Sequence, residues 1–114
     1  MAVRSNNPTK PVLNQTVSTS TPVKSAVLNM SFVAAPQVGY IVQVGAGLTA
    51  TFNILVSIDN VLFVDSGQIL PSVSGSALNF SAQYSGAFPY VLLQVTQSAG
   101  SGTVYVQACS KGVG

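Results

Sequence analysis

The sequence TATFNILVSI, residues 49–58, determines the fold class that we expect for this chain. Every second position of this stretch is apolar, at Ala50, Phe52, Ile54, Val56 and Ile58. Side chains two positions apart point to the same face of a β-strand, so this row is expected to lie in a core. Asp59-Asn60 follows and predicts a two-residue turn, because both residue types tolerate positive φ. We therefore predict that residues 61–65 return as its hairpin partner.

The same two-residue period recurs on both sides of this stretch. It predicts strands at residues 28–32, 40–44, 77–83, 90–97 and 103–108, with a short edge strand near Ile69. We expect Pro36 to end the first of these, because proline cannot donate to a strand ladder. Roughly seven or eight short strands, with turns about every 8–12 residues, are typical of a sandwich or barrel. The expected fold is an all-β antiparallel β-sandwich of jelly-roll or Ig-like type.

The N-terminal segment differs in composition from the rest, and we predict an extended arm at 1–25 and a β-sandwich domain at 26–114. Three prolines stand there among Ser, Thr and Asn, which favours an extended chain over a helix. Two interpretations remain open. Either the arm is disordered, or it becomes ordered only against a neighbouring subunit. In the second case Arg4, Lys10 and Lys24 would contact an acidic surface of that subunit.

Charged residues are almost absent from the chain. They make up 5% of it, against about 25% in a typical soluble domain, while hydrophobic residues make up 47%. A surface this poor in charge tends to associate with other surfaces. One interpretation is a monomer kept soluble by hydroxyl and amide groups. We favour the other, in which other subunits bury much of the surface. We therefore expect a homo-oligomer, and specifically a trimer.

Reactive side chains are too few for most kinds of catalytic site. The chain has no His and no Glu, its two acidic side chains are Asp59 and Asp65, and Cys109 is its single cysteine. A Ser-His-Asp site or a zinc site therefore cannot form within one chain. Calcium binding by the two aspartates is one interpretation; we prefer turn residues that bind local backbone N–H groups. We expect no enzymatic activity, no cofactor and no metal.

Membranes and nucleic acids are disfavoured as partners. No stretch reaches the roughly 18 apolar residues that span a bilayer, and no apolar leader suggests a Sec signal. The net charge is only +2, and no basic stripe exists to displace counterions from phosphates, so nucleic-acid binding is not expected.

Three aromatic residues, Tyr84, Phe88 and Tyr90, bracket one predicted loop. Packing against the core is the simpler interpretation for aromatic residues near strands. The alternative is a surface patch that stacks on sugars or contacts another subunit.

Three segments resemble small β-sandwich proteins from the virions of tailed bacteriophages: ILVSIDNVLFV at 54–64, YVLLQVT at 90–96 and SGTVYV at 101–106. Those proteins often carry a Ser-x-Asp-Gly-x-x-aromatic hairpin and end in a Ser-Gly-Thr-Val-x-Val strand; Phe63 stands near their usual Trp. The resemblance implies a virion structural protein of the capsid decoration, or cement, type, assembled in the host cytoplasm. Its partners would be the major capsid protein or other virion subunits. The alternative is a receptor- or glycan-binding module on a tail or fibre.

Overall fold

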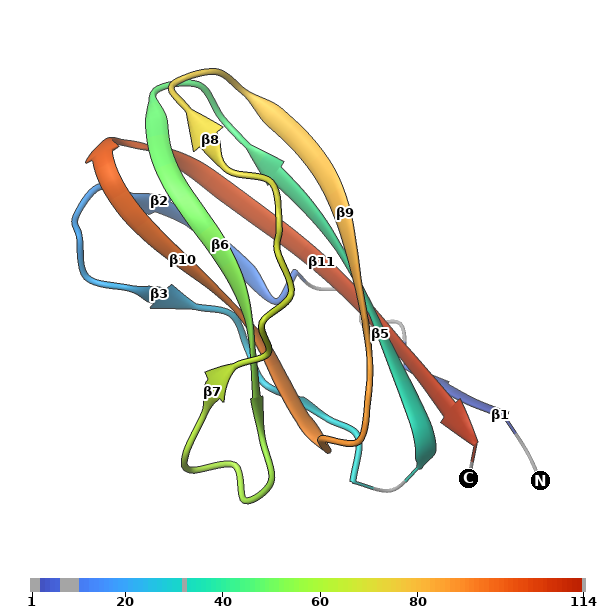
Figure 1. Ribbon diagram of the computed structural model, residues 1–114. Coiled ribbons are helices and arrows are strands. Elements are labelled where there is room, and N and C mark those ends of the chain that lie inside the picture. The colour runs from blue at the N-terminus through green and yellow to red at the C-terminus, as the bar shows by residue number, and fades with distance from the viewer. Residues whose placement is uncertain (1–2, 7–10, 32, 114) are drawn as a thin grey trace.

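The computed structural model describes residues 3–6, 11–31 and 33–113, and all regular structure in them is β-strand (Figure 1). Five strands are long: β5 (Ala34–Val44), β6 (Leu48–Ser57), β9 (Leu78–Ser85), β10 (Tyr90–Gly100) and β11 (Gly102–Val113). Six are short: β1 (Val3–Asn6), β2 (Leu13–Val17), β3 (Val23–Lys24), β4 (Leu28–Asn29), β7 (Val64–Asp65) and β8 (Val73–Ser74). In these residues there is no helix with the length and apolarity needed to cross a membrane.

The strands form two antiparallel sheets. The first has the order β1–β11–β5–β9, with β2 beside β1 along β11. The second has the order β3–β10–β6–β7, with β4 also on β10 and β8 also on β6. The connections β5–β6, β9–β10 and β10–β11 each pass from one sheet to the other, so the sheets lie face to face (Figure 1). The predicted antiparallel β-sandwich is confirmed.

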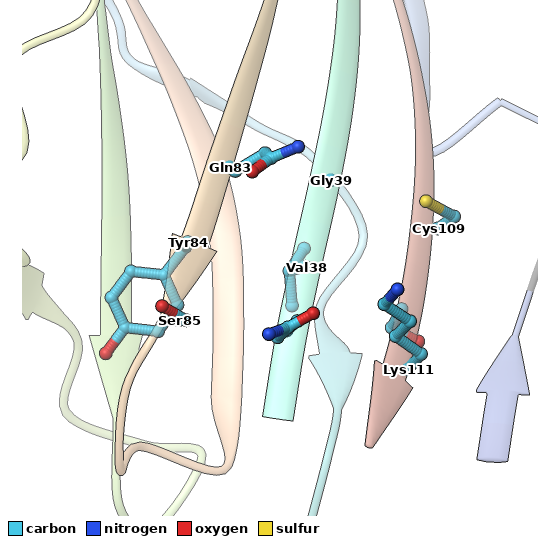
Figure 2. Close-up of a pocket in the computed structure, with 9 residues that line it drawn as sticks. Val38, Gly39, Gln83, Tyr84, Ser85, Cys109 and Lys111 are labelled. Atoms are coloured by element: carbon cyan, nitrogen blue, oxygen red, sulfur yellow. The ribbon is translucent and has the colours of Figure 1, made fainter. Parts of the chain in front are cut away.

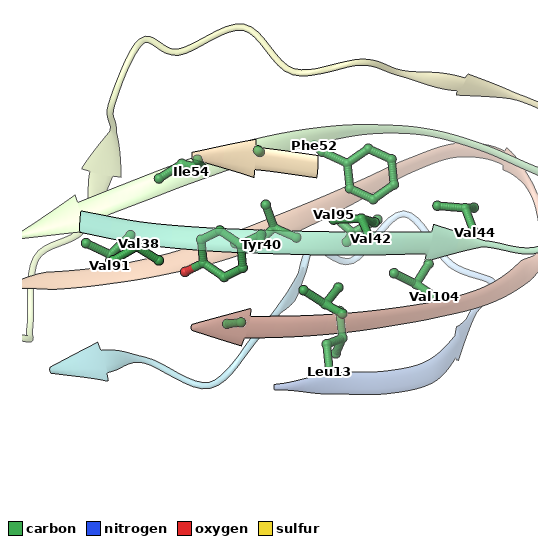
Figure 3. Packing of buried hydrophobic residues seen from close by; sticks show 14 of the residues in the cluster. Leu13, Val38, Tyr40, Val42, Val44, Phe52, Ile54, Val91, Val95 and Val104 are labelled. Carbon is green, nitrogen blue, oxygen red and sulfur yellow. The ribbon is translucent and has the colours of Figure 1, made fainter. Parts of the chain in front are cut away.

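The core lies between the sheets and is built from the inward rows of the long strands (Figure 3). On β6, the alternation noted above places Ala50, Phe52, Ile54 and Val56 in this core. Three other long strands contribute rows of the same kind: Val38, Tyr40, Val42 and Val44 on β5; Val91, Leu93 and Val95 on β10; and Val104, Val106 and Ala108 on β11. The small, β-branched residues that dominate these rows pack well on a pleated surface.

Two glycines let the connections at one end of the sandwich touch. The Ser101 N–H donates a hydrogen bond of 3.1 Å to the Gly47 carbonyl, so the β10–β11 turn lies against the β5–β6 turn. Gly100 has φ +68°, and a Cβ added there would overlap the Gly47 carbonyl oxygen. Only glycine combines this backbone conformation with so close an approach.

Pro36 lies inside β5, so the prediction that it ends a strand is wrong. Ala35 has φ 50°, and the register with β11 shifts between Lys111 and Val113. Pairing with β9 begins only at Gln37. The proline therefore occupies a bulge at the strand end, where its missing N–H removes no ladder hydrogen bond.

The hairpin after residue 58 is also wider than predicted. β6 ends at Ser57, and only Val64 and Asp65 pair back, with Val56 and Leu55. Ile58, expected in the core, is 74% exposed. Asn60 does have φ 62°, as expected for a turn residue. In the predicted strand at 28–32, Leu28 and Asn29 pair with β10, residues 30 and 31 lie outside any strand, and residue 32 is outside the described residues.

The segment predicted to be an arm contributes three strands to the sheets of its own chain. β1 pairs with residues 110–113 of β11, and β2 pairs with residues 102–106. β3 pairs with β10 in the other sheet. Between β3 and β4, Ser25 continues the contact, because its N–H donates to the Leu93 carbonyl (2.8 Å) and its Oγ accepts from the Leu93 N–H (2.9 Å).

Candidate functional site

Both aspartates organise loops, as the sequence predicted. Asp59 Oδ1 accepts hydrogen bonds from the backbone N–H groups of Val61 (2.9 Å) and Leu62 (3.0 Å) and from the Ser57 hydroxyl (3.1 Å). These bonds hold the pKa of the Asp59 carboxyl below its usual value. Asp65 accepts from the Gly67 N–H (2.8 Å) and from Asn53 Nδ2 (3.0 Å). Within the residues described, no three His, Cys, Asp or Glu side chains gather as metal ligands would.

The core contains one titratable side chain, Tyr40, which is almost fully buried. Burial raises the pKa of its hydroxyl, and the nearby Ser25 hydroxyl lowers it only in part. Ser25 directs its own hydrogen bond to the Ala26 carbonyl (3.1 Å). The Tyr40 hydroxyl has no hydrogen bond of acceptable geometry to any described residue. This group can move no proton to a substrate, because it has no access to the surface.

The most unusual surface is at the end of the sandwich where the β6–β7 loop and the β9–β10 loop meet. We call it the hairpin-end patch, formed by the exposed apolar side chains of Ile58, Val61, Leu62, Val64 and Phe88. Val61 is 82% exposed and Leu62 is 70% exposed. Four of the five, all but Val61, line a shallow hollow of about 350 Å³. Asp59, also at its rim, is its one charged group among the described residues.

Asp59 explains why this patch forms. Its carboxylate binds the N–H groups of residues 61 and 62 and thereby holds a wide loop in place of a tight hairpin. The apolar side chains of that loop therefore point outward. Sequence reasoning missed the patch because it placed Ile58 in the core and residues 61–65 in a strand. The available signal was the run VLFV at 61–64, which has no polar alternation.

The three aromatic residues singled out from the sequence have different environments. Tyr84 is half-buried on β9 and packs against the core, and a Cβ on Gly86 would overlap its hydroxyl. Partial burial raises the pKa of Tyr84, and the adjacent Phe88 backbone opposes this rise. Phe88 is exposed in the hairpin-end patch. Tyr90 is half-buried on β10, opposite Asn29 and Ser57.

A second hollow lies on the outer face of the first sheet, across β9, β5 and β11 (Figure 2). It measures about 650 Å³, and its lining mixes polar and apolar surface and includes Gln37, Gln83, Cys109 and Lys111. Gly39 forms its floor, since a Cβ there would approach Cys109 Sγ to 3.2 Å. It is wide and open, and none of the four side chains named is buried. It therefore provides an open surface with one charged group among the described residues, Lys111, and no enclosed binding site.

The structure describes different amounts of the three cationic residues that were proposed as arm contacts. Lys24 is exposed on β3, where its backbone pairs with Gln94. The backbone of Arg4 lies in β1, opposite Gly112, and its side chain lies outside the described part of the structure. Lys10 is outside the described residues. Of these three side chains, the structure therefore describes that of Lys24 alone.

No protein-family model and no curated protein sequence matches this chain. Solved structures do match its fold. The chain is similar to a chain in the structure of infectious bursal disease virus, Gt strain, with a TM-score of 0.57 and 8% identity over 96% of its length. A chain in the Gx strain structure gives a TM-score of 0.56 and 10% identity over 99%. This chain spans about a third of those two chains, at 31% and 32% of their length.

A carbohydrate-binding β-sandwich also matches. It is the CBM22-1 xylan-binding domain of Paenibacillus barcinonensis Xyn10C, with a TM-score of 0.45 and 10% identity. The match covers 94% of this chain and 83% of that domain. The likeness to the two virus chains, at 8% and 10% identity, is a likeness of fold alone.

Proposed function

We propose that this chain is a non-catalytic structural subunit of a virus particle, of the capsid decoration (cement) type, which joins shell subunits. The hairpin-end patch carries the proposal. Contiguous apolar side chains on a surface are costly to hydrate, and patches of this kind mark sites of contact with other proteins. The patch needs a partner that buries it, and the Asp59 carboxylate holds the main chain of the loop that presents it, by accepting hydrogen bonds from the N–H groups of Val61 and Leu62.

Further support comes from the small number of charged groups on the described surface. The described side chains include four charged groups, Lys24, Asp59, Asp65 and Lys111, and both aspartates bind their own loops. Adhesion over a broad uncharged surface requires area and shape, not reactive groups. The fold likeness to chains in a virus structure accords with this role. In this proposal the partners are the major capsid protein or other virion subunits, and the protein is located in the virion.

The test is co-sedimentation with empty shells assembled from the capsid protein encoded in the same genome. We expect wild-type protein to pellet with the shells. The double variant Val61→Asn, Leu62→Asn should bind at least tenfold more weakly, because it removes two apolar contacts from the patch. Both side chains are largely exposed, so the variant should keep the wild-type fold.

Ile69→Asn is the matched control. Ile69 is 94% exposed and does not line the hollow of the patch, so the same kind of substitution there should leave binding unchanged. A wild-type protein that fails to pellet with the shells would refute the cement role. Equal loss of binding in the control would show that general surface apolarity, and not the patch, mediates the contact.

The second candidate is a receptor- or glycan-binding module on a tail or fibre that uses the loop between Tyr84 and Tyr90. Its support is narrower, because only Phe88 of the three aromatic residues is exposed. Glycan-array binding by the wild-type protein that disappears in Phe88→Ala would favour this candidate over the cement role.

A further inference from the structure

The two sheets have four lateral edges, and three of them are formed by short strands. β1 and β2 cover one side of β11 with strands of four and five residues. In the second sheet, two pairs of two-residue strands flank the central β10 and β6: β3 with β4, and β7 with β8. Short, interrupted edge strands prevent pairing with other chains.

β9 is the exception. It forms the fourth edge with eight residues, LNFSAQYS, and pairs with β5 without a bulge from Leu78 to Ser85. It contains no proline and no charge, which are the usual means of blocking an edge. Apart from the ladder with β5, no hydrogen bond to β9 main chain exists among the described residues. Every second residue therefore presents its N–H and C=O groups to solvent.

The inward row of β9 is also incomplete. Leu78, Phe80 and Tyr84 pack against the core, yet each is only half-buried because no strand lies beyond them. Phe80 contacts Phe52 edge-to-face, with ring centroids 5.2 Å apart. A further strand beside β9 would cover the exposed part of this row and would satisfy the free backbone groups at the same time.

We propose that β9 pairs antiparallel with β9 of a second copy of this chain, which joins the two first sheets into one continuous sheet. A partner that pairs along all eight residues needs an edge strand of similar length, and β9 is the one edge strand among the described residues with this length. Antiparallel self-pairing places the same row opposite itself, so Asn79, Ser81 and Gln83 meet equivalent neutral side chains.

The geometry of the pair follows from the direction of the strands. Eight paired residues form a seam about 27 Å long. β9 runs toward the end of the sandwich that carries the hairpin-end patch (Figure 1). Because paired strands run in opposite directions, the two patches lie at opposite ends of the dimer. The proposed dimer has two-fold symmetry and thus differs from the trimer expected from the sequence. This inference does not depend on the proposed function.

Sedimentation equilibrium over about 10 µM to about 1 mM tests the proposal. We expect wild-type protein to form a dimer, and the double variant Ser81→Lys, Gln83→Lys to dissociate at least tenfold more readily. The lysines place like charges across the two-fold seam. Both side chains are exposed in the single chain, so its own fold should be unaffected.

The control is Gln43→Lys, Gln107→Lys. It adds the same charge to the same outer face, but on β5 and β11, away from the edge. This control should dimerise as the wild type does. If both lysine variants dissociate equally, the sheets associate through their faces and the proposal is wrong.

Amide hydrogen exchange of the wild-type protein provides a readout that requires no variant. In the proposed dimer, exchange of the outward β9 amides slows as protein concentration rises, while that of the β1 and β2 amides does not change. A protein that remains monomeric throughout the concentration range, or a dimer without concentration-dependent protection in residues 78–85, would overturn the proposal.

Discussion

The two edges of the first sheet are constructed in opposite ways. On one side, β2 and β1 lie one after the other along β11 and pair with its residues 102–106 and 110–113. On the other side, β9 pairs with β5 over eight residues and has a free outer edge. The first edge comes from a segment that contains prolines and cations, whereas β9 contains neither.

This difference shows that the edge of a sheet can be covered by a segment that is distant in the sequence from the long strands of that sheet. The segment that precedes β5 contributes strands to both sheets, and none of these is longer than five residues. Such strands leave little continuous backbone for another chain to pair with. In residues 3–6, 11–31 and 33–113, no comparable segment covers β9, so the two sides of the first sheet differ in their capacity to pair with another chain.

The largest expected effect is a loss of stability on truncating a buried side chain of β2, one of the two strands that cover β11. Leu13 lies on β2, is buried and belongs to the core cluster. Leu13→Ala should lower the free energy of unfolding by about 2–4 kcal/mol, because it leaves a cavity where β2 packs on the core. Urea unfolding followed by circular dichroism measures this. Gln15→Ala, on the same strand but exposed, should change it by less than about 0.5 kcal/mol. Equal values for both variants would mean that β2 contributes little to stability.

The second-largest expected loss of stability concerns Ser25, which lies between β3 and β4 at one edge of the second sheet. The buried Ser25 Oγ accepts a hydrogen bond from the Leu93 N–H and donates one to the Ala26 carbonyl. Ser25→Ala should cost about 1–2 kcal/mol of unfolding free energy, because the buried Leu93 N–H loses its acceptor. The exposed Ser18→Ala provides the baseline in the same urea experiment. A result at that baseline would show that water replaces the hydroxyl.

The smallest effect concerns β5, which lies between the two edges. Tyr40 contributes a buried hydroxyl without a good hydrogen bond. Tyr40→Phe should therefore leave the unfolding free energy unchanged or raise it by up to about 1 kcal/mol. A loss above about 1 kcal/mol would indicate that the hydroxyl has a stabilising partner.

Tyr40 also determines the expected response to alkaline pH. Burial raises the pKa of Tyr40 in the folded state, so the folded state favours the protonated hydroxyl. The corresponding stability is fully present below pH 10, the usual tyrosine pKa, and is lost as pH rises above it. Thermal melting midpoints between pH 9 and pH 11 should fall less steeply in Tyr40→Phe than in wild type. Tyr84→Phe, at a partly buried site, should change this slope less.

Much of the fold was predictable because the core-facing side chains of the long strands recur at every second residue. This period located β6, β9, β10 and β11, whose core-facing side chains are local in sequence. Pro36 was misjudged because its bulge depends on a register shift opposite Gly112, about 76 residues further along the chain. Alternation within one strand carries no information about such distant partners.

The candidate surfaces were less predictable, for a related reason. The hairpin-end patch exists because the Asp59 carboxylate holds a wide loop, whereas Asp59-Asn60 predicted a tight turn followed by a strand. The free edge of β9 depends on the order of strands in the sheet. An edge strand and a central strand can have the same alternation, so the period alone did not distinguish β9 from β5.

The pairing of β1 with β11 has a consequence for folding. Val3 pairs with Val113, so the segments at the two ends of the chain lie side by side (Figure 1). On the ribosome, β1 and β2 emerge before β11 and have no partner strand until β11 has been synthesised. Loop-closure entropy opposes a contact between segments so far apart in the sequence, so this pairing forms only after the strands between them are available. The nascent chain is therefore most exposed to strand exchange with neighbouring nascent copies before this pairing forms.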